Sequence, residues 1–222
     1  MNAALATAPT GAAPPTPVTV RVAAPGEYDA VRALLLRAYE SRFWITSSYR
    51  ESLLDIEGHV ADHGPDGPRG EDLIIAADGG GDAGGHRILG AVFVPRDTQT
   101  GPDGAVEQSF GRLGVAPEAA GRGIARVLVE HIEALARGRG ASRIAIHSGP
   151  QMHGAHRMYE HLGYLRRPER EDLVVDSGQR LLVYTRELGE PEAMPRASGP
   201  PARPDDPRTD PALRAPDPRR IP

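Results

Sequence analysis

The chain has 222 residues, a formal net charge of -4 at pH 7, and neither Cys nor Lys. The lack of Cys excludes a disulfide framework, a thiolate metal site and a Cys nucleophile, and the lack of Lys excludes a Lys nucleophile, a Schiff base and a P-loop Lys. The mildly negative charge gives no general attraction to nucleic acid or to an anionic membrane, so we expect neither as a partner.

Both ends of the chain are rich in Pro and poor in large apolar residues, so we expect disordered segments at 1–17 and 189–222 around one folded unit at 18–188. Residues 1–17 lack the basic and apolar regions of a secretory signal, and no run approaches the roughly 18 apolar residues of a transmembrane helix. We therefore expect a cytoplasmic protein. The Pro-Arg-Asp pattern of the tail leaves a partner-docking segment open as an alternative to a solvated one.

Hydrophobic periodicity predicts seven strands and four helices in the order β-α-α-β-β-β-α-β-α-β-β, which is typical of an α/β or α+β layered domain with a mixed sheet and helices on its faces. Strands are predicted at 18–22, 73–77, 88–94, 106–115, 143–147, 173–175 and 180–186. Helices are predicted at 26–42, from a cap at Ser47 or Ser48 through Ile56, from Ile124 to Gly138 or Gly140, and at 151–162. In the long strand 106–115, Gly111 and Gly114 indicate a bulge or a close backbone approach.

A glycine turn joins the long strand to the third helix and has the features of an anion site. The loop Ala120-Gly121-Arg122-Gly123-Ile124-Ala125 opens this helix. The first turn of a helix carries unpaired N–H groups and the positive end of the dipole, and glycines let a phosphate approach the backbone. Arg122 and Arg126 would add side-chain charge. A tight strand-to-helix connection with no ligand fits this loop equally well. A Rossmann fingerprint is excluded because Arg126 stands where its third Gly would be, and a Walker loop is excluded because there is no Lys.

Two segments of the chain resemble signatures of the GNAT superfamily of N-acetyltransferases. The run Leu113-Gly114-Val115-Ala116-Pro117 with the loop 120–125 is similar to the family's acyl-CoA motif, Gln/Arg-x-x-Gly-x-Gly/Ala. About thirty residues later, Ala155-His156-Arg157-Met158-Tyr159-Glu160-His161-Leu162-Gly163-Tyr164 is similar to its Ala-x-x-x-Tyr-x-x-x-Gly-Phe/Tyr helix. Ala120 departs from the first motif, and Met152 stands where many members have an Asn that touches the pantetheine arm.

The resemblance implies a GNAT-like fold over about 18–188, with a mixed, mostly antiparallel sheet flanked by helices, and acetyl-CoA as co-substrate. It implies that the strand at Leu113, Gly114 and Val115 splays from its neighbour, pairs with pantetheine and polarises the thioester carbonyl through N–H groups. The phosphates would be held by Gly121, Arg122, Gly123, Ile124, Ala125 and Arg126. It also implies an amine of a small molecule or peptide as the acceptor, and pairing of two copies through the last strands is common among similar proteins.

The family role of protonating the leaving thiolate belongs to the Tyr that matches Tyr159, and a phenol is a suitable acid. A core Tyr is the alternative, since this residue shares an apolar helix face with Ala155 and Leu162. The base is less clear. Glu107 could relay a proton through water or be a solvated carboxylate, and His147 could be a base or simple polar lining.

The remaining candidates concern metals, the acceptor and the overall function. His147, His153, His156 and His161 do not form a recognisable ligand set, so we expect no metal. Segment 43–46 and the helix after it lie where such enzymes bind the acceptor, although Phe43 and Trp44 could equally be core residues. A non-catalytic acyl-CoA-binding sensor with the same fold stays open beside the enzyme.

Overall fold

The computed structural model describes residues 17–64, 67–79, 86–175 and 177–189. The expected disordered segments lie almost entirely outside these residues. Within the described part of the chain, no helix combines the length and the apolar character needed to cross a bilayer.

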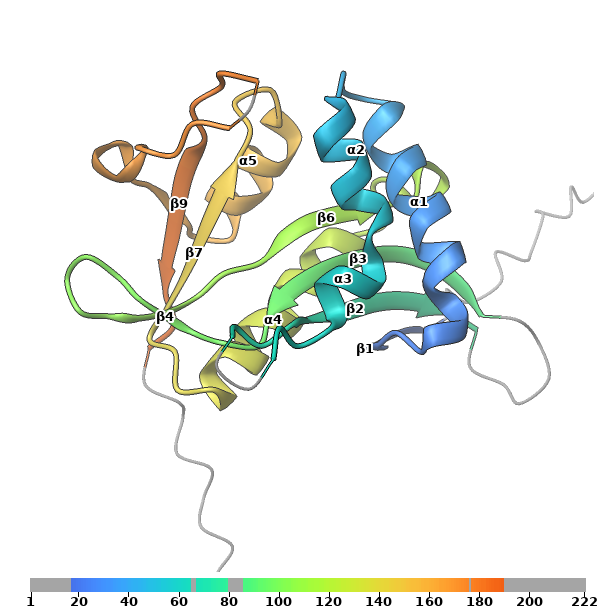
Figure 1. Cartoon of the computed structure of the whole chain (residues 1–222), viewed down its shortest axis with the longest axis horizontal. Helices are drawn as coiled ribbons and strands as arrows, with labels where there is room; N and C mark the ends of the chain where they lie inside the picture. The colour runs from blue at the N-terminus through green and yellow to red at the C-terminus, as the bar shows by residue number, and fades with distance from the viewer. Residues whose placement is uncertain (1–16, 65–66, 80–85, 176, 190–222) are drawn as a thin grey trace, which may run out of the picture. The chain divides into compact units, whose positions relative to one another are not determined.

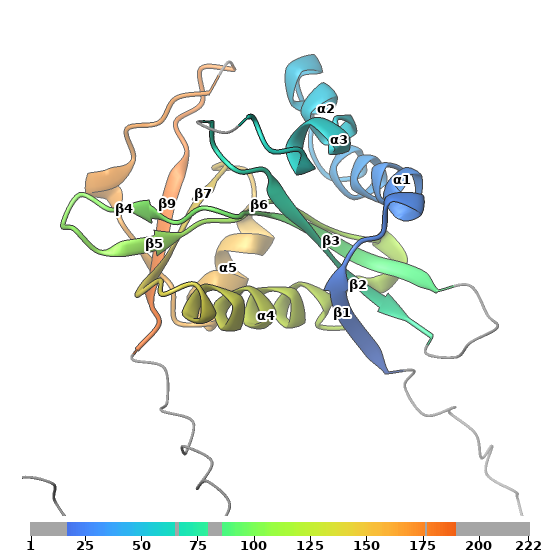
Figure 2. The same cartoon turned by 60° about the horizontal axis from the view of Figure 1, so that its bottom comes forward.

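The first sheet has the strand order β1-β2-β3-β6 and is antiparallel throughout. Its strands are β1 (Val18–Val22), β2 (Glu71–Asp78), β3 (Arg87–Pro95) and β6 (Gly111–Val115). Helix α1 (Tyr28–Glu40) lies over one face and α4 (Ile124–Gly138) lies over the other (Figure 2). Because both faces are covered, β2 and β3 are apolar and buried along most of their length instead of alternating.

The second sheet has the order β4-β5-β7-β9-β8, and the pairing of β5 with β7 is parallel while the others are antiparallel. The strands are β4 (Gln99–Thr100), β5 (Val106–Gln108), β7 (Arg143–Ser148), β9 (Leu182–Glu187) and β8 (Leu165–Arg166). Helix α5 (His153–His161) lies beside β7 and β9 (Figure 1). The expected α+β fold class, with mixed, mostly antiparallel sheets flanked by helices, is confirmed.

The expected continuous strand at 106–115 is wrong. It divides into β5 and β6, which belong to different sheets. The register of β6 against β3 shifts between Ala91 and Phe93, and Arg112 opposite this shift has a left-handed φ of 51°. A bulge bends a strand and increases its twist, which accounts for the separation of the two halves.

Two other boundaries also differ from the expectation. The strand expected at 173–175 contains only the isolated bridge between Val174 and Arg180. Strand β8 was not predicted, because its two residues, Leu165 and Arg166, are both exposed and show no hydrophobic pattern. Helix α2 (Ser47–Leu54) is capped by Thr46, whose hydroxyl accepts the N–H of Tyr49 at 3.2 Å, and not by Ser47 or Ser48.

The second helix ends earlier than expected because Asp55 starts a new one. Its carboxylate accepts the N–H of Gly58 at 3.0 Å and caps α3 (Ile56–Val60). Short 3₁₀ turns at Pro25–Glu27, Pro117–Ala119 and Pro168–Arg170 complete the described elements.

Gly114 explains how closely α1 can pack on β6. A Cβ at this position would lie 2.8 Å from Cδ2 of Leu35 and 3.3 Å from Cβ of Ala38. The predicted close backbone approach is therefore present, and it fixes the end of α1 directly above the strand that borders the site described next.

Candidate functional site

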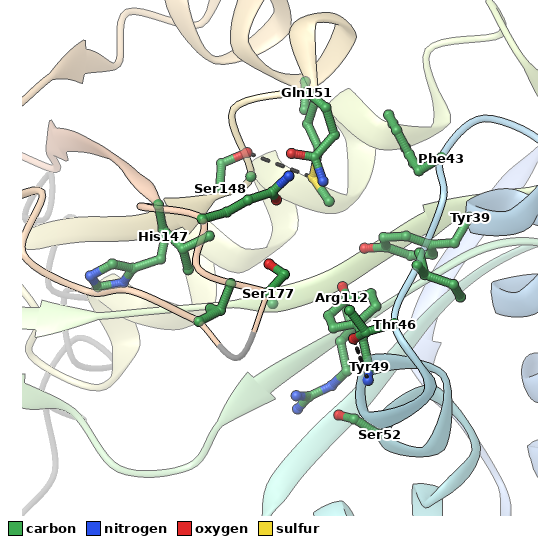
Figure 3. Close-up of a pocket in the computed structure, with 18 of the residues that line it drawn as sticks. Tyr39, Phe43, Thr46, Tyr49, Ser52, Arg112, His147, Ser148, Gln151 and Ser177 are labelled. Atoms are coloured by element: carbon green, nitrogen blue, oxygen red, sulfur yellow. Dashed lines mark hydrogen bonds between the residues drawn. The ribbon is translucent and has the colours of Figure 1, made fainter.

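A cavity of about 530 Å³ opens between β6 and β7, where the two sheets separate (Figure 3). Its walls come from the end of α1, the segment 43–46, α2, the start of β6, the end of β7, α5 and the segments 173–175 and 177–181. The lining includes Tyr39, Phe43, Trp44, Tyr49, Arg112, Leu113, His147, Ser148, Met152, Ala155, Tyr159, Leu173 and Val174. The cavity is thus lined both by the helix of the second signature and by segment 43–46, where the acceptor was expected.

Tyr159 lies on α5 and contributes to the wall of this cavity. Its side chain is only 5% exposed, and its ring lies 6.2 Å from that of Phe110 and 5.6 Å from that of Tyr164. Burial raises the pKa of the phenol far above its ordinary value, with smaller contributions from Tyr49 and Tyr184. The phenol is therefore protonated at neutral pH, and a protonated phenol beside a cavity is able to act as a proton donor.

The glycine loop has the backbone geometry of an open helix N-terminus. Gly121 and Gly123 both have φ of 77°, and Gly123 is the N-cap of α4. The first backbone hydrogen bond into the helix runs from the N–H of Val127 to the carbonyl of Gly123, at 3.1 Å. The N–H groups of Ile124, Ala125 and Arg126 precede this bond and have no acceptor within the helix. Such N–H groups are able to bind an anion, and the phosphate contacts of this loop stay a prediction.

The two arginines of this loop lie at the surface in weak pairs. Arg126 donates to Glu130 at 2.7 Å, one helical turn away, and the guanidinium of Arg122 lies 3.8 Å from the carboxylate of Asp78. Both side chains are partly exposed, and exposed pairs of this kind contribute at most about 1 kcal/mol. Either side chain can therefore turn towards a phosphate at little cost. Ala120 adds no polar side chain, so the anion contacts would be those of the backbone and of these two arginines.

β6 is the last strand of the first sheet, and its free edge faces the cavity. Gly114 pairs with Ala91 and Val115 with Gly90 on the other edge. The phenol of Tyr39 donates to the carbonyl of Leu113 at 3.1 Å. The separation of β6 from β7 agrees with the splay that the resemblance implied, while contacts to a cofactor at Leu113, Gly114 and Val115 stay predictions.

Arg112 was not a predicted site residue, yet it lines the cavity at the bulge of β6. Its guanidinium lies 4.6 Å from the ring centre of Phe93 and forms an ion pair with Glu71, which also lies 3.5 Å from the imidazole of His59. The left-handed φ of a non-glycine residue is uncommon and costs about 1–2 kcal/mol. Only the adjacent Gly111 gave a signal of a bulge in the sequence.

Glu107, the predicted base, does not line the cavity. It is buried in β5 and accepts hydrogen bonds from Arg170 at 2.7 and 2.8 Å and from Arg143 at 3.0 Å. Its role as the base stays a prediction. Burial raises the pKa of its carboxyl, but hydrogen bonds from Arg170 and then Arg143 outweigh it and lower the pKa. A carboxylate stabilised in this way accepts a proton poorly, so its surroundings favour a structural ion cluster.

His147 lies at the end of β7 and lines two cavities, the one between β6 and β7 and a second one of about 530 Å³. Its side chain is exposed, and Figure 3 shows its ring turned away from Tyr39 and Tyr49. Partial burial and then the charge of Arg170 lower its pKa, while Asp172 and Glu107 act in the opposite direction. It is therefore a neutral base at neutral pH.

His156 lies on α5 and packs behind the wall of the cavity. His156 is buried, its Nε2 lies 3.1 Å from Oγ of Ser148, and its ring stacks on Tyr184 at 5.3 Å. Among the residues that the structure describes, no group of three or more His, Asp or Glu side chains is close enough to hold a metal ion. The pairing with Ser148 gives His156 a packing role in the wall behind the cavity.

Comparison with known proteins adds a family and a set of similar folds. The model of the acetyltransferase (GNAT) family matches residues 35–164. No curated protein matches the chain by sequence. A GNAT-family acetyltransferase from Staphylococcus aureus has 14% identity and a TM-score of 0.55, with 78% of this chain and 99% of that chain covered.

Two further solved structures of similar fold are an N-acetyltransferase and a complex that contains CoA. The ribosomal-protein-S18-alanine N-acetyltransferase of Escherichia coli has 16% identity and a TM-score of 0.50, covering 80% of this chain and 98% of that one. A chain of the NatC complex bound to Gag peptide and CoA has 16% identity and a TM-score of 0.52, covering 77% and 98%. At these identities the likeness shows the fold alone.

Proposed function

Because the chain belongs to the GNAT acetyltransferase family, we propose that it transfers an acetyl group from acetyl-CoA directly to a primary amine of a small molecule or peptide. The observation that carries this proposal is the position of Tyr159, on α5 in the wall of the cavity between β6 and β7. The solved structure of NatC with a peptide and CoA supports the choice of donor and acceptor.

Acetyl-CoA would be held by main chain more than by side chains. The free N–H groups at the start of α4, after Gly123, would bind its phosphates, with Arg122 and Arg126 adding charge. The open edge of β6 would pair with the pantetheine arm, and the N–H groups near Leu113 and Gly114 would polarise the thioester carbonyl. This arrangement leaves the acetyl group in the cavity that Tyr159 lines.

The proposed transfer is a single displacement at the thioester carbon. The amine nitrogen forms a bond to the carbonyl carbon, the carbon–sulfur bond breaks, and the sulfur takes a proton from the phenol of Tyr159. The proton that leaves the amine passes through water to His147, whose neutral imidazole lines the same cavity. Glu107 is the weaker candidate for this step because Arg170 and Arg143 hold its charge.

A non-catalytic acyl-CoA sensor is the alternative, and it would use the same loop and strand without the proton donor. Release of free thiol from acetyl-CoA with a panel of amines separates the two. We expect amine-dependent thiol release together with binding of CoA by calorimetry. Binding of CoA without thiol release on any aminoglycoside, polyamine, amino acid, arylalkylamine or peptide N-terminus would favour the sensor.

The substitution Gly123→Ala tests the phosphate cradle. A Cβ there meets no atom within 4 Å, so the cost comes from the left-handed φ of 77°, about 1–2 kcal/mol. Relief of this strain would turn the first N–H groups of α4 away from the anion. We expect the Kd of CoA to rise about tenfold, a loss of about 1.4 kcal/mol, measured by calorimetry.

Gly138→Ala is the matched control because it lies in the last turn of the same helix, also has free space around its Cβ, and has no left-handed φ. Ala there is expected to leave CoA affinity unchanged and to raise helix stability slightly. Equal CoA affinities of Gly123→Ala and the wild type would contradict the cradle.

A further inference from the structure

The cavity has a second half that the donor chemistry does not use. Its lining includes Met152, Ala155 and Tyr159. Figure 3 shows Gln151, in the segment before α5, on one side and Tyr39 and Tyr49, at the end of α1 and on α2, on the other. The use of this second half by the acceptor rests on the proposed function, in which the donor brings the acetyl group into the cavity.

The second half is built from aromatic rings. The ring of Tyr39 lies 5.5 Å from that of Tyr49 in an edge-on arrangement and 6.3 Å from that of Phe43. Such pairs leave ring faces and edges available to a further ring, and aromatic contacts contribute about 0.5–1.5 kcal/mol beyond the area they bury. The hydroxyl of Tyr39 is already used by the carbonyl of Leu113, so its ring is fixed in place.

The rim of the same cavity exposes large apolar side chains. Trp44 is 83% exposed, and Leu173 and Val174 across the opening are 45% and 49% exposed. Soluble proteins seldom gather such side chains at one place unless they meet a ligand. A planar apolar group that entered between Trp44 and Val174 would cover this rim.

The charge of the wall also selects among amines. Among the described lining residues, the permanently charged side chain is Arg112, which is fixed by Phe93 and by Glu71 behind it. Glu71 compensates this charge, and none of the described lining residues is Asp or Glu, so the wall offers no carboxylate to an acceptor that carries several ammonium groups. It tolerates an acceptor whose single amine becomes neutral before it reacts.

We infer that the acceptor is a small arylalkylamine, with its ring held between the aromatic cluster and Trp44 and its single amine directed towards Tyr159. The volume of about 530 Å³ lies within the ~300–1,000 Å³ typical of small-molecule sites, and the acetyl end of the donor occupies part of it. Polyamines and aminoglycosides fit this wall poorly because they carry several charges and little apolar surface.

The test compares three probes on the CoA-loaded protein: 2-phenylethylamine, propylamine and spermidine. Calorimetry is expected to give at least about tenfold tighter binding of 2-phenylethylamine than of the other two, since burying a ring contributes more than about 1.4 kcal/mol. Trp44→Ala is expected to reduce this preference about tenfold. Val22→Ala, which truncates another exposed apolar side chain away from the cavity, is expected to leave it unchanged.

Measurements of amine binding and of thiol release distinguish the arylalkylamine inference from the proposed acetyl transfer. A ring preference without thiol release would support the inference and contradict the proposed function, whereas thiol release with equal or better use of spermidine would do the reverse. A ring preference that is the same in Trp44→Ala and in the wild type would overturn the inference.

Discussion

Replacement of Tyr159 by Phe is expected to lower kcat by about 10²–10³-fold and to leave the Kd of acetyl-CoA unchanged. The substitution removes one oxygen atom from a ring that is otherwise packed against Phe110 and Tyr164, so the apolar contacts of the ring stay in place. What is lost is the proton for the departing thiolate. Steady-state thiol release and calorimetry with acetyl-CoA measure the two quantities independently.

Tyr164→Phe is the matched control for this variant. Tyr164 is buried beside Tyr159 but does not line the cavity, and its phenol donates to Glu133 at 3.0 Å. In this variant Glu133 still accepts the hydrogen bond from Arg186 at 2.7 Å, so the loss of the Tyr164 hydrogen bond is expected to cost about 1 kcal/mol of folding stability. The control is expected to leave kcat unchanged. If Tyr159→Phe retained the wild-type kcat, Tyr159 would have no part in the chemistry.

Replacement of His147 by Gln is expected to lower kcat/KM by about 10²-fold near neutral pH and to change its pH dependence. The pKa of His147 is lowered from the usual histidine value, so the active neutral form is present at pH 7 and is lost as the pH falls through this lowered pKa. The wild type should therefore lose activity on the acid side, and the variant should not show that limb. An arylamine that is uncharged across the measured pH range is used as the acceptor, so that titration of the acceptor does not contribute to the pH profile.

The groups that face His147 must be considered in this measurement. They are Asp103, Glu107, Arg143, Arg167, Glu169, Arg170 and Asp172, from β5, β7, and the segments before β5 and after β8. Hydrogen bonds from arginines lower the pKa values of the Asp103 and Glu107 carboxyls, so these two groups keep their charge while the imidazole of His147 titrates. His153→Gln, an exposed position on α5 outside both cavity linings, is the control, and partial rescue of His147→Gly by free imidazole would distinguish a proton acceptor from a structural residue. An unchanged acid limb in His147→Gln would contradict the role.

The parts of the site that local sequence could specify were predicted. The glycines at 121 and 123 are required by a backbone conformation that other residues adopt only with strain, so the loop was visible in the sequence. The apolar spacing on the second signature helix likewise placed Tyr159 on an inward face. Both signals depend on neighbours within a few residues.

The parts that depend on distant neighbours were missed. Nothing near residues 106–115 indicated that its two halves would join different sheets, because that outcome depends on the pairing of Glu107 with Arg143 and of Gly114 with Ala91. In the same way, the surroundings of Glu107 were not visible in the sequence, because the arginine that pairs with it, in the segment after β8, is 63 residues away. A carboxylate in a strand pattern has the same sequence signature whether it faces solvent, substrate or a guanidinium.

The free edge of β6 has a consequence for the handling of the protein. An unpaired strand edge presents a row of backbone N–H and C=O groups that another chain can extend, and this is a common start of aggregation. A donor molecule bound along β6 would cover that row and also stabilise the folded state by mass action. Preparations saturated with CoA should therefore stay monodisperse longer on storage than empty ones, and the amide of Leu113 should exchange its hydrogen more slowly in them.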